Sequence, residues 1–167
     1  MDDELQAIEP IEPPGPVELP IGMLTGRVDD KGRLKLPTDL IEYFKKLPEK
    51  TLFVTSLDGR MGQLYLKSTW LRNQKFFQTY REKPALTQKV SFLAAAMGAQ
   101  VEMDAQGRVQ LPMKLRKELG LEEGVVHVYA YNGRIQILTE ALYQEKFSSA
   151  RQGGEDNVYE LETVGFE

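Results

Sequence analysis

The stretch Asp-Asp-Lys-Gly-Arg-Leu-Lys-Leu-Pro at residues 29–37 returns as Asp-Ala-Gln-Gly-Arg-Val-Gln-Leu-Pro at residues 104–112. Five positions are identical at a spacing of 75 residues: Asp29 with Asp104, Gly32 with Gly107, Arg33 with Arg108, Leu36 with Leu111, and Pro37 with Pro112. The agreement continues beyond the motif, where Leu40 corresponds to Leu115. This correspondence predicts an internal repeat in which each copy presents a tight turn with basic side chains.

Each copy of the motif has the pattern of a strand, a turn and a second strand. Gly32 can adopt the positive φ that such a turn requires. Residues 33–36 alternate strictly between polar and apolar, which places Arg33 and Lys35 together on the outer face of a strand. Residues four apart lie close across the turn, so Asp29 is expected to accept hydrogen bonds from turn amides or from Arg33. In the simplest alternative, the Asp and Arg side chains bind only each other and serve only to stabilise the turn.

The segments around the two motifs follow one order. In the first copy the pattern predicts strands at 21–28 and 33–36, a helix at 39–46 capped by Thr38, strands at 52–55 and 64–66, and a helix from Ser68 or Thr69 that Pro84 stops. A helix at 86–97 comes next. The second copy predicts strands at 100–103 and 108–111, a helix at 113–119, strands at 125–131 and 134–138 around Asn132-Gly133, and a helix at 140–149. Each unit therefore reads strand–turn–strand–helix, twice.

These patterns divide the chain into five parts. We expect an acidic, proline-rich disordered arm at 1–18, a first unit at 19–82, a linking helix at 83–98, a second unit at 99–149, and an acidic C-terminal tail at 150–167. Leu71, Lys75 and Phe76 correspond to Leu142, Lys146 and Phe147 at a spacing of 71, so the second unit is four residues shorter between its halves.

The composition indicates a soluble globular protein. Of 167 residues, 41% are hydrophobic and 28% are charged, and the chain has no Cys. The absence of Cys excludes disulfides and thiolate metal sites. The N-terminus is acidic rather than basic and apolar, so no secretory signal or membrane span is expected. We expect a cytoplasmic location.

The formal net charge of −4 hides an uneven distribution. Residues 1–18 contain six acids and no base, and residues 148–167 contain five acids and one base. The segment 19–147 carries 20 basic and 14 acidic residues. A cationic body with acidic ends fits a polyanion such as nucleic acid, and the alternative is a solvated mixed surface.

No arrangement of residues predicts catalysis. His127 is the only histidine, and it lies within an alternating strand pattern without a nucleophile elbow elsewhere. Asp29, Asp30 and Asp58 lack the spacing of a calcium loop, and the glycines do not form a phosphate loop. The sequence therefore predicts a protein that is not an enzyme, with no metal, no cofactor and no small-molecule substrate.

The turns favour double-stranded DNA as the partner. A two-stranded ribbon fits the major groove, where Arg reads guanine and Lys contacts phosphate or guanine edges. Residues 29–35 have Lys on both sides of Arg33, whereas Gln106 and Gln110 replace those lysines in the second copy, whose helix adds Lys114, Arg116 and Lys117. Residues 29–35 are therefore expected to be the principal DNA contact. The candidate DNA-binding residues are Asp29, Lys31, Gly32, Arg33, Lys35, Asp104, Gly107 and Arg108.

The chain resembles the MraZ family of bacterial regulators. The resemblance rests on the motifs at 28–37 and 103–112, on the apolar helix before the second motif, on Tyr-Asn-Gly-Arg-Ile-Gln-Ile at 131–137, and on the final Val-Gly-Phe at 164–166. It implies a mixed α+β, mainly β fold: two tandem AbrB-like (SpoVT-AbrB) swapped-hairpin units in one pseudo-symmetric β-barrel with flanking helices. Family members often have Arg near the start of the first strand, where this chain has Ile21 after an acidic arm.

The same resemblance implies a function. It is that of a nucleoid-associated transcription factor, usually a repressor, of the division and cell wall gene cluster. Such a factor binds short direct repeats upstream of its own operon as a homo-oligomer, in the form of a ring. Two alternatives remain open. One is an antitoxin-like interaction module that uses the acidic tail at 155–167, and the other is a structural oligomer whose basic turns face neighbouring subunits.

Overall fold

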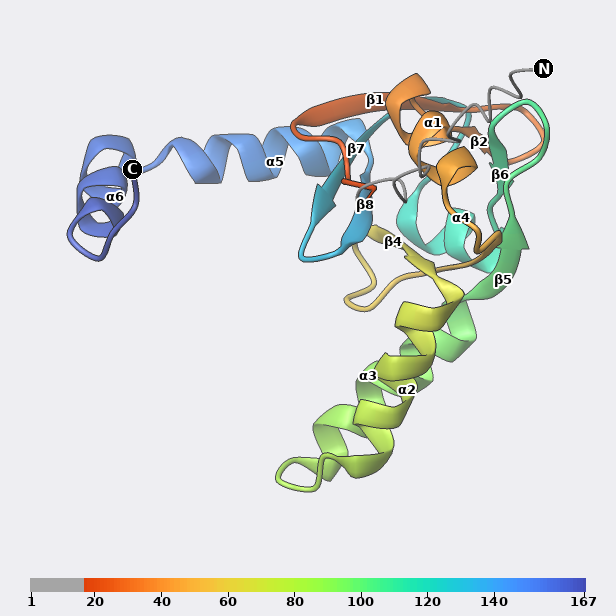
Figure 1. Ribbon diagram of the computed structural model, residues 1–167, viewed down its shortest axis with the longest axis horizontal. Helices are drawn as coiled ribbons and strands as arrows, with labels where there is room; N and C mark the ends of the chain where they lie inside the picture. Colours follow the sequence, from red (N-terminus) through yellow and green to blue (C-terminus); the bar gives the residue numbers. More distant parts are fainter. Residues whose placement is uncertain (1–16) are drawn as a thin grey trace, which may run out of the picture.

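The computed structural model describes residues 17–167, which form a β-barrel with two helical projections (Figure 1). The first unit contains β1 (Met23–Val28), β2 (Arg33–Lys35), α1 (Thr38–Lys46), β3 (Thr51–Thr55), β4 (Gly62–Leu66) and α2 (Lys67–Thr79). After α3 (Pro84–Met97), the second contains β5 (Ala99–Glu102), β6 (Arg108–Gln110), α4 (Met113–Leu119), β7 (Gly124–Tyr131), β8 (Arg134–Leu138) and α5 (Glu140–Arg151). The chain ends with α6 (Gly154–Glu162). The predicted acidic arm lies outside the described residues, apart from residues 17 and 18.

The eight strands of residues 17–167 join one antiparallel sheet in the order β5-β3-β4-β8-β7-β1-β2-β6. The two units exchange strands, because β1 pairs with β7 and β5 pairs with β3. The edge strands β5 and β6 are consecutive in the chain and lie close together, so the sheet is nearly closed. This confirms the predicted mixed α+β fold of two swapped-hairpin units in one barrel.

The repeat in the sequence is a twofold relation in space. In the β2–β6 pair, Leu34 lies opposite Val109, its counterpart at a spacing of 75. In the β4–β8 pair, Leu64 lies opposite Ile135, its counterpart at a spacing of 71. A pseudo-twofold axis therefore passes through both strand pairs, and it relates the turn before β2 to the turn before β6.

Both units contribute to one hydrophobic core. The Leu-Pro end of each motif buries its leucine, Leu36 at 2% exposure and Leu111 at 1%. The helix that follows each motif adds a further buried leucine, Leu40 or Leu115. Burial of a leucine side chain contributes about 1.5–3 kcal/mol. Because these residues belong to a single cluster, the two units stabilise each other and fix the relative position of their turns.

Several helix ends differ from the predictions. Pro37 precedes α1 and no side chain caps it, so the proposed cap by Thr38 is wrong. Helix α2 begins at Lys67, and the backbone amide and hydroxyl of Ser68 both bond to the Glu49 carboxylate, at 2.7 and 2.6 Å. Pro84 does not stop α2 but begins α3, because the fixed φ of proline suits a first helical turn.

The end of the chain is more helical than predicted. Helix α5 is capped by Thr139, as expected, whose hydroxyl accepts a 3.2 Å hydrogen bond from the amide of Leu142, but it continues to Arg151. Helix α6 was not predicted at all. Within the described part of the chain, no helix combines the length and the apolar character needed to cross a membrane.

Candidate nucleic acid interface

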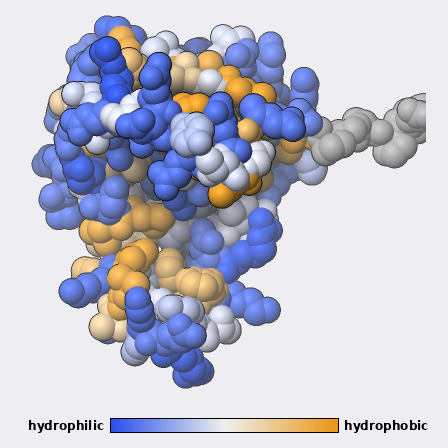
Figure 2. All heavy atoms as spheres, turned by 90° about the vertical axis from the view of Figure 1, so that its left-hand side faces the viewer, coloured by the Kyte–Doolittle hydropathy of each residue, from blue (hydrophilic) through white to orange (hydrophobic). Residues whose placement is uncertain are grey.

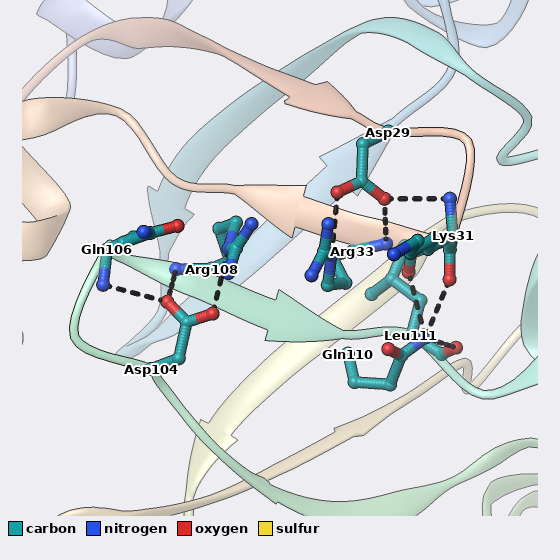
Figure 3. A network of polar contacts seen from close by, with 9 residues as sticks. Asp29, Lys31, Arg33, Asp104, Gln106, Arg108, Gln110 and Leu111 are labelled. Carbon is teal, nitrogen blue, oxygen red and sulfur yellow. Dashed lines mark hydrogen bonds and ion pairs between the residues drawn. The ribbon is translucent and has the colours of Figure 1, made fainter.

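The two turns, turn 1 at residues 29–33 and turn 2 at residues 104–108, have the same internal hydrogen bonds (Figure 3). In turn 1, Asp29 Oδ1 accepts from the amides of Lys31 and Arg33 at 3.0 and 2.9 Å, and Oδ2 accepts from Arg33 Nε at 2.7 Å. In turn 2, Asp104 accepts the equivalent bonds, all at 2.8–2.9 Å. The expected donors, the turn amides and the arginine side chain, are both present in each turn. The aspartate thus fixes the turn and the guanidinium together.

These hydrogen bonds favour the ionised form of both aspartates. The bond from the Arg33 backbone amide, followed by the bond from its guanidinium, lowers the pKa of Asp29. The amide and guanidinium of Arg108 lower the pKa of Asp104 in the same way. Both turns are therefore ordered by charged carboxylates near neutral pH.

Backbone hydrogen bonds between the units hold the turns against each other. The amide of Leu36 donates to the Gly107 carbonyl, and the amide of Leu111 donates to the Gly32 carbonyl, each at 3.0 Å. Both glycines have positive φ, 76° and 77°. The site residues predicted from the two motifs are thereby brought to one region of the barrel.

Strand pairing places basic side chains from three strands in one row. Arg27 on β1 lies opposite Lys35 on β2, and Lys35 lies opposite Arg108 on β6. Arg27 and Lys35 are exposed and form no ion pair with any described residue. Like charges placed directly opposite each other in a sheet are destabilising unless an anion compensates them. The sequence prediction missed Arg27, although its position one residue before the buried Val28 indicates an outward side chain.

Lys35 and Gln110 have equivalent structural roles. Lys35 Nζ donates to the backbone carbonyl of Gln106, and Gln110 Nε2 donates to the carbonyl of Lys31 at 3.1 Å. Each residue therefore reaches from its own strand to the turn of the other unit. The exchange of Lys for Gln at this position changes the charge but conserves the contact.

A helix residue from the opposite unit covers each turn. A methyl group placed on Gly32 would lie 2.2 Å from Cζ of Arg116, so the guanidinium of Arg116 lies directly against turn 1. A methyl group on Gly107 would lie 2.2 Å from Cδ1 of Ile41. Ile41 and Arg116 are counterparts at a spacing of 75. Turn 1 therefore receives a cation from the second unit, whereas turn 2 receives an apolar side chain from the first.

The buried part of Arg116 adds to this asymmetry. Its Nε is buried and has no hydrogen-bond partner among the described residues. No carboxylate of the described residues forms an ion pair with Arg116, whereas Lys114 on the same helix pairs with Glu118 at 3.1 Å. The positive charge at turn 1 is thus larger than the motif alone provides.

His127 belongs to a structural contact rather than to this region. Its ring is half-buried, makes a hydrogen-bond contact with the Glu140 carboxylate and stacks on Tyr143 at 3.7 Å between ring centroids. Among residues 17–167, no group of three or more His, Cys, Asp or Glu residues is placed to hold a metal ion.

The fold and this region define a class of protein: a barrel of two tandem swapped-hairpin units with two turns on one surface. In each turn an aspartate binds and orients the arginine. A family profile described as "MraZ protein, putative antitoxin-like" matches residues 94–155. A protein from Acidobacterium capsulatum named "Transcriptional regulator MraZ" is 34% identical over 133 residues, which cover 78% of this chain and 88% of the relative. The chain belongs to the MraZ family.

Two further relatives carry the same name. The protein from Koribacter versatilis is 32% identical over 131 residues, covering 78% of this chain and 88% of the relative. The protein from Caldicellulosiruptor saccharolyticus is 28% identical over 151 residues, covering 87% and 98%. The names of these relatives are those of transcriptional regulators and not of enzymes.

Proposed function

We propose that this protein is a DNA-binding transcriptional regulator that contacts duplex DNA through the surface formed by β1, β2, β6 and the two turns. The observation that carries the proposal is the row of basic side chains Arg27, Lys35 and Arg108 across three adjacent strands. Neighbouring strands are about 4.8 Å apart, so the row spans roughly 10 Å. This width is comparable to the major groove of B-DNA, which is about 12 Å wide.

Within this surface we assign base contact to Arg33 and Arg108. Each guanidinium uses Nε to bind its aspartate, at 2.7 and 2.8 Å, and no described residue accepts a hydrogen bond from either pair of terminal Nη groups. A guanidinium fixed at Nε is oriented before binding, which suits bidentate recognition of guanine O6 and N7. Asp29 and Asp104 act by holding these side chains, and Gly32 and Gly107 act by allowing the turns.

The lysines complete the contact as phosphate ligands. Lys31 is exposed at the tip of turn 1, and Lys35 lies exposed in the basic row. Arg116 adds a guanidinium to the same turn from the opposite unit. Contacts to phosphates carry affinity and register rather than base sequence. Turn 1 is accordingly the principal contact, and turn 2 is the weaker one.

The relatives are named transcriptional regulators, and the finer regulatory role is our own proposal. We propose that the protein acts, usually as a repressor, on the division and cell wall gene cluster through short direct repeats upstream of its own operon. A ring of several copies would present turn 1 to successive repeats. Weak individual contacts would then add through a high effective concentration. In this role the protein would associate with the nucleoid.

A salt titration tests the proposal against both alternatives. Fluorescence anisotropy would follow binding to a labelled duplex from upstream of the gene and to a scrambled duplex, between 50 and 200 mM salt. With four or five phosphate contacts, the slope of log Kobs against log salt is expected near −4. Tighter binding of the upstream duplex at every salt concentration supports the proposal. Equal, weak binding of both duplexes contradicts it and favours the interaction module or the structural oligomer.

A further inference from the structure

A groove opens between β1 and the start of α1, which lie together at the top of Figure 1. It has a volume of about 500 Å³, and its walls are residues 24–27 of β1 and residues 35–39, which lead from β2 into α1. Strand β2 pairs with β1 at Arg27 and Val28, and beyond this point the two segments diverge. The groove is therefore the gap that remains where the β1–β2 ribbon opens.

Backbone groups on both walls of this groove are free. No backbone hydrogen bond joins residues 23–26 of β1 to residues 36–39 on the opposite wall. A free strand edge of this kind binds an extended peptide through main-chain hydrogen bonds. On the other wall, the amides of Thr38 and Asp39 donate to no described residue, and no side chain caps α1. Free amides at the start of a helix favour a carboxylate.

The side chains of the groove combine apolar walls with a basic rim. Three apolar residues line it, Leu24, Pro37 and Val125, of which Val125 is 48% exposed. Arg27 and Lys35 are its basic lining residues, and both belong to the row of basic side chains described above. The acidic residue of the lining is Asp39, in the first turn of α1. An extended peptide with aliphatic side chains and several carboxylates fits this surface.

The sequence that precedes the described residues has this chemistry, with a period of three. Residues 8–13 read Ile-Glu-Pro-Ile-Glu-Pro, and residues 17–19 read Val-Glu-Leu. Residues 1–16 contain five acids and no base. A polyproline II helix has three residues per turn, so in that conformation the aliphatic and acidic side chains would form separate faces. The described end of this pattern shows the same division, because Val17 is half-buried and Glu18 is exposed.

We propose that residues 1–16, here called the N-terminal segment, dock in the groove of their own chain and compete there with DNA. In this complex Ile8 and Ile11 contact the apolar walls, and the carboxylates face the basic rim and the start of α1. The segment spans about 55 Å when extended, so it reaches the groove from Val17. The docked segment covers Arg27 and Lys35, two of the three residues in the basic row. The competition rests on the proposed function, whereas the docking does not.

The helical hairpin of α2 and α3, residues 67–97, is the alternative surface for an acidic segment. It carries six basic residues and one acid. Apolar residues also gather on it, at the bottom of Figure 2. The hairpin consists of helices, so it has no strand edge to offer. The groove is favoured because it combines cations, free amides at a helix start and a free strand edge.

Disulfide trapping tests the docking without DNA. The chain has no Cys, so Ala7→Cys with Thr25→Cys creates a single pair between the N-terminal segment and the groove. The matched control joins Ala7→Cys with Gln74→Cys, which is exposed on the hairpin. The groove pair should form an intrachain disulfide about tenfold faster, because docking raises the local thiol concentration. Ile8→Ser with Ile11→Ser should abolish this difference. Equal rates, a faster hairpin pair, or disulfides that join two copies on a non-reducing gel would each overturn the proposal.

DNA affinity measures the competition. Ile8→Ser with Ile11→Ser keeps every acid of the segment, so it removes the docking without changing the charge. Binding of the upstream duplex should tighten about three- to tenfold, because an internal competitor is released. Val125→Ser should give the same gain from the groove side, and the two changes together should give no more. Gln6→Ser, outside the aliphatic positions, is the control and should have no effect.

The two measurements separate the docking from the function. Unchanged affinity in the Ile8→Ser, Ile11→Ser variant would overturn the competition, even where the groove disulfide forms. If neither this variant nor wild type binds any duplex, the proposed function fails, and the disulfide rates still decide whether the segment docks.

Discussion

Turn 1 and turn 2 have the same backbone shape and the same Asp–Arg staple, but their surroundings differ in charge. Their equivalent hydrogen bonds agree to about 0.1 Å, from the turn amides to the carboxylate and from the guanidinium to the carboxylate. The shared Asp, Gly and Arg are enough to form a turn of this shape. The two turns differ in the surrounding charged side chains, and these are the residues expected to change DNA affinity.

Three pairs of counterparts add positive charge at turn 1, whereas the exposed Asp30, the counterpart of Ala105, adds an acid there. Arg27 beside turn 1 corresponds to Glu102, which accepts a 3.4 Å hydrogen bond from Thr51, and Lys31 corresponds to Gln106. The third pair acts across the units, since Arg116 covers turn 1 and Ile41 covers turn 2. Lys35 opposes this difference, because its Nζ donates to the Gln106 carbonyl in turn 2, whereas the uncharged Gln110 makes the equivalent contact with turn 1. Positive charge therefore gathers at turn 1 from both halves of the chain.

The largest difference is expected from the two arginines. Arg33→Ala should bring specific DNA binding down to the non-specific level, a loss of roughly 100-fold, because one bidentate base contact contributes about 1–3 kcal/mol. Arg108→Ala should cost less than tenfold. A gel shift with the upstream duplex measures both, and thermal unfolding confirms that each variant remains folded, since Asp29 and Asp104 keep their bonds to backbone amides. A loss from Arg108→Ala equal to or larger than that from Arg33→Ala would reverse the ranking of the turns.

A smaller effect is expected from Arg116. Arg116→Met keeps the length of the side chain and removes its charge, so affinity at 100 mM salt should fall about three- to tenfold and the salt slope should decrease by about 0.9. The preference for the upstream duplex over the scrambled one should stay the same, because a phosphate contact does not read bases. Arg116→Lys should restore most of the affinity.

Lys114 offers the matched control for this measurement. It lies on the same helix and is paired with Glu118, so Lys114→Met should change affinity less than twofold. If Arg116→Met and Lys114→Met change DNA affinity by the same amount, the Arg116 side chain packs on turn 1 without contributing its charge to DNA binding. The charge difference between the turns would then rest on Arg27 and its acidic counterpart Glu102, because the charges of Asp30 and Lys31 cancel.

The local structure of the turns was predictable from the sequence. The Asp-x-x-x-Arg spacing and the glycine fix the turn by contacts within five residues, and strict alternation places Arg33 outward. The buried leucines of the motif follow from the same alternation. The strand at 134–138 was predictable for a similar reason, because Asn132 and Gly133 both adopt the positive φ that the hairpin turn needs.

The relation between the units was not predictable from local patterns. The pairing of β2 with β6, which places Lys35 opposite Arg108, joins residues more than 70 positions apart. Arg116 was expected only as one of three basic residues on a helix, and nothing in the sequence shows that its side chain covers the turn of the other unit. Helix α6 was missed because Gly153 and Gly154 indicate the end of a helix, and because no side chain of α6 is buried against the other described residues.

The smallest difference between the turns is expected on acidification. The pKa values of Asp29 and Asp104 are both lowered in the folded protein, chiefly by backbone amides, so each carboxylate adds stability that is present above the unfolded pKa of about 3.9. This stability is lost as the pH falls through the lower folded pKa. Urea unfolding between pH 6 and pH 3 should therefore show a steeper loss for wild type than for Asp29→Asn with Asp104→Asn. The two single variants should be equal, and unequal slopes would mean that the turns differ in structure as well as in charge.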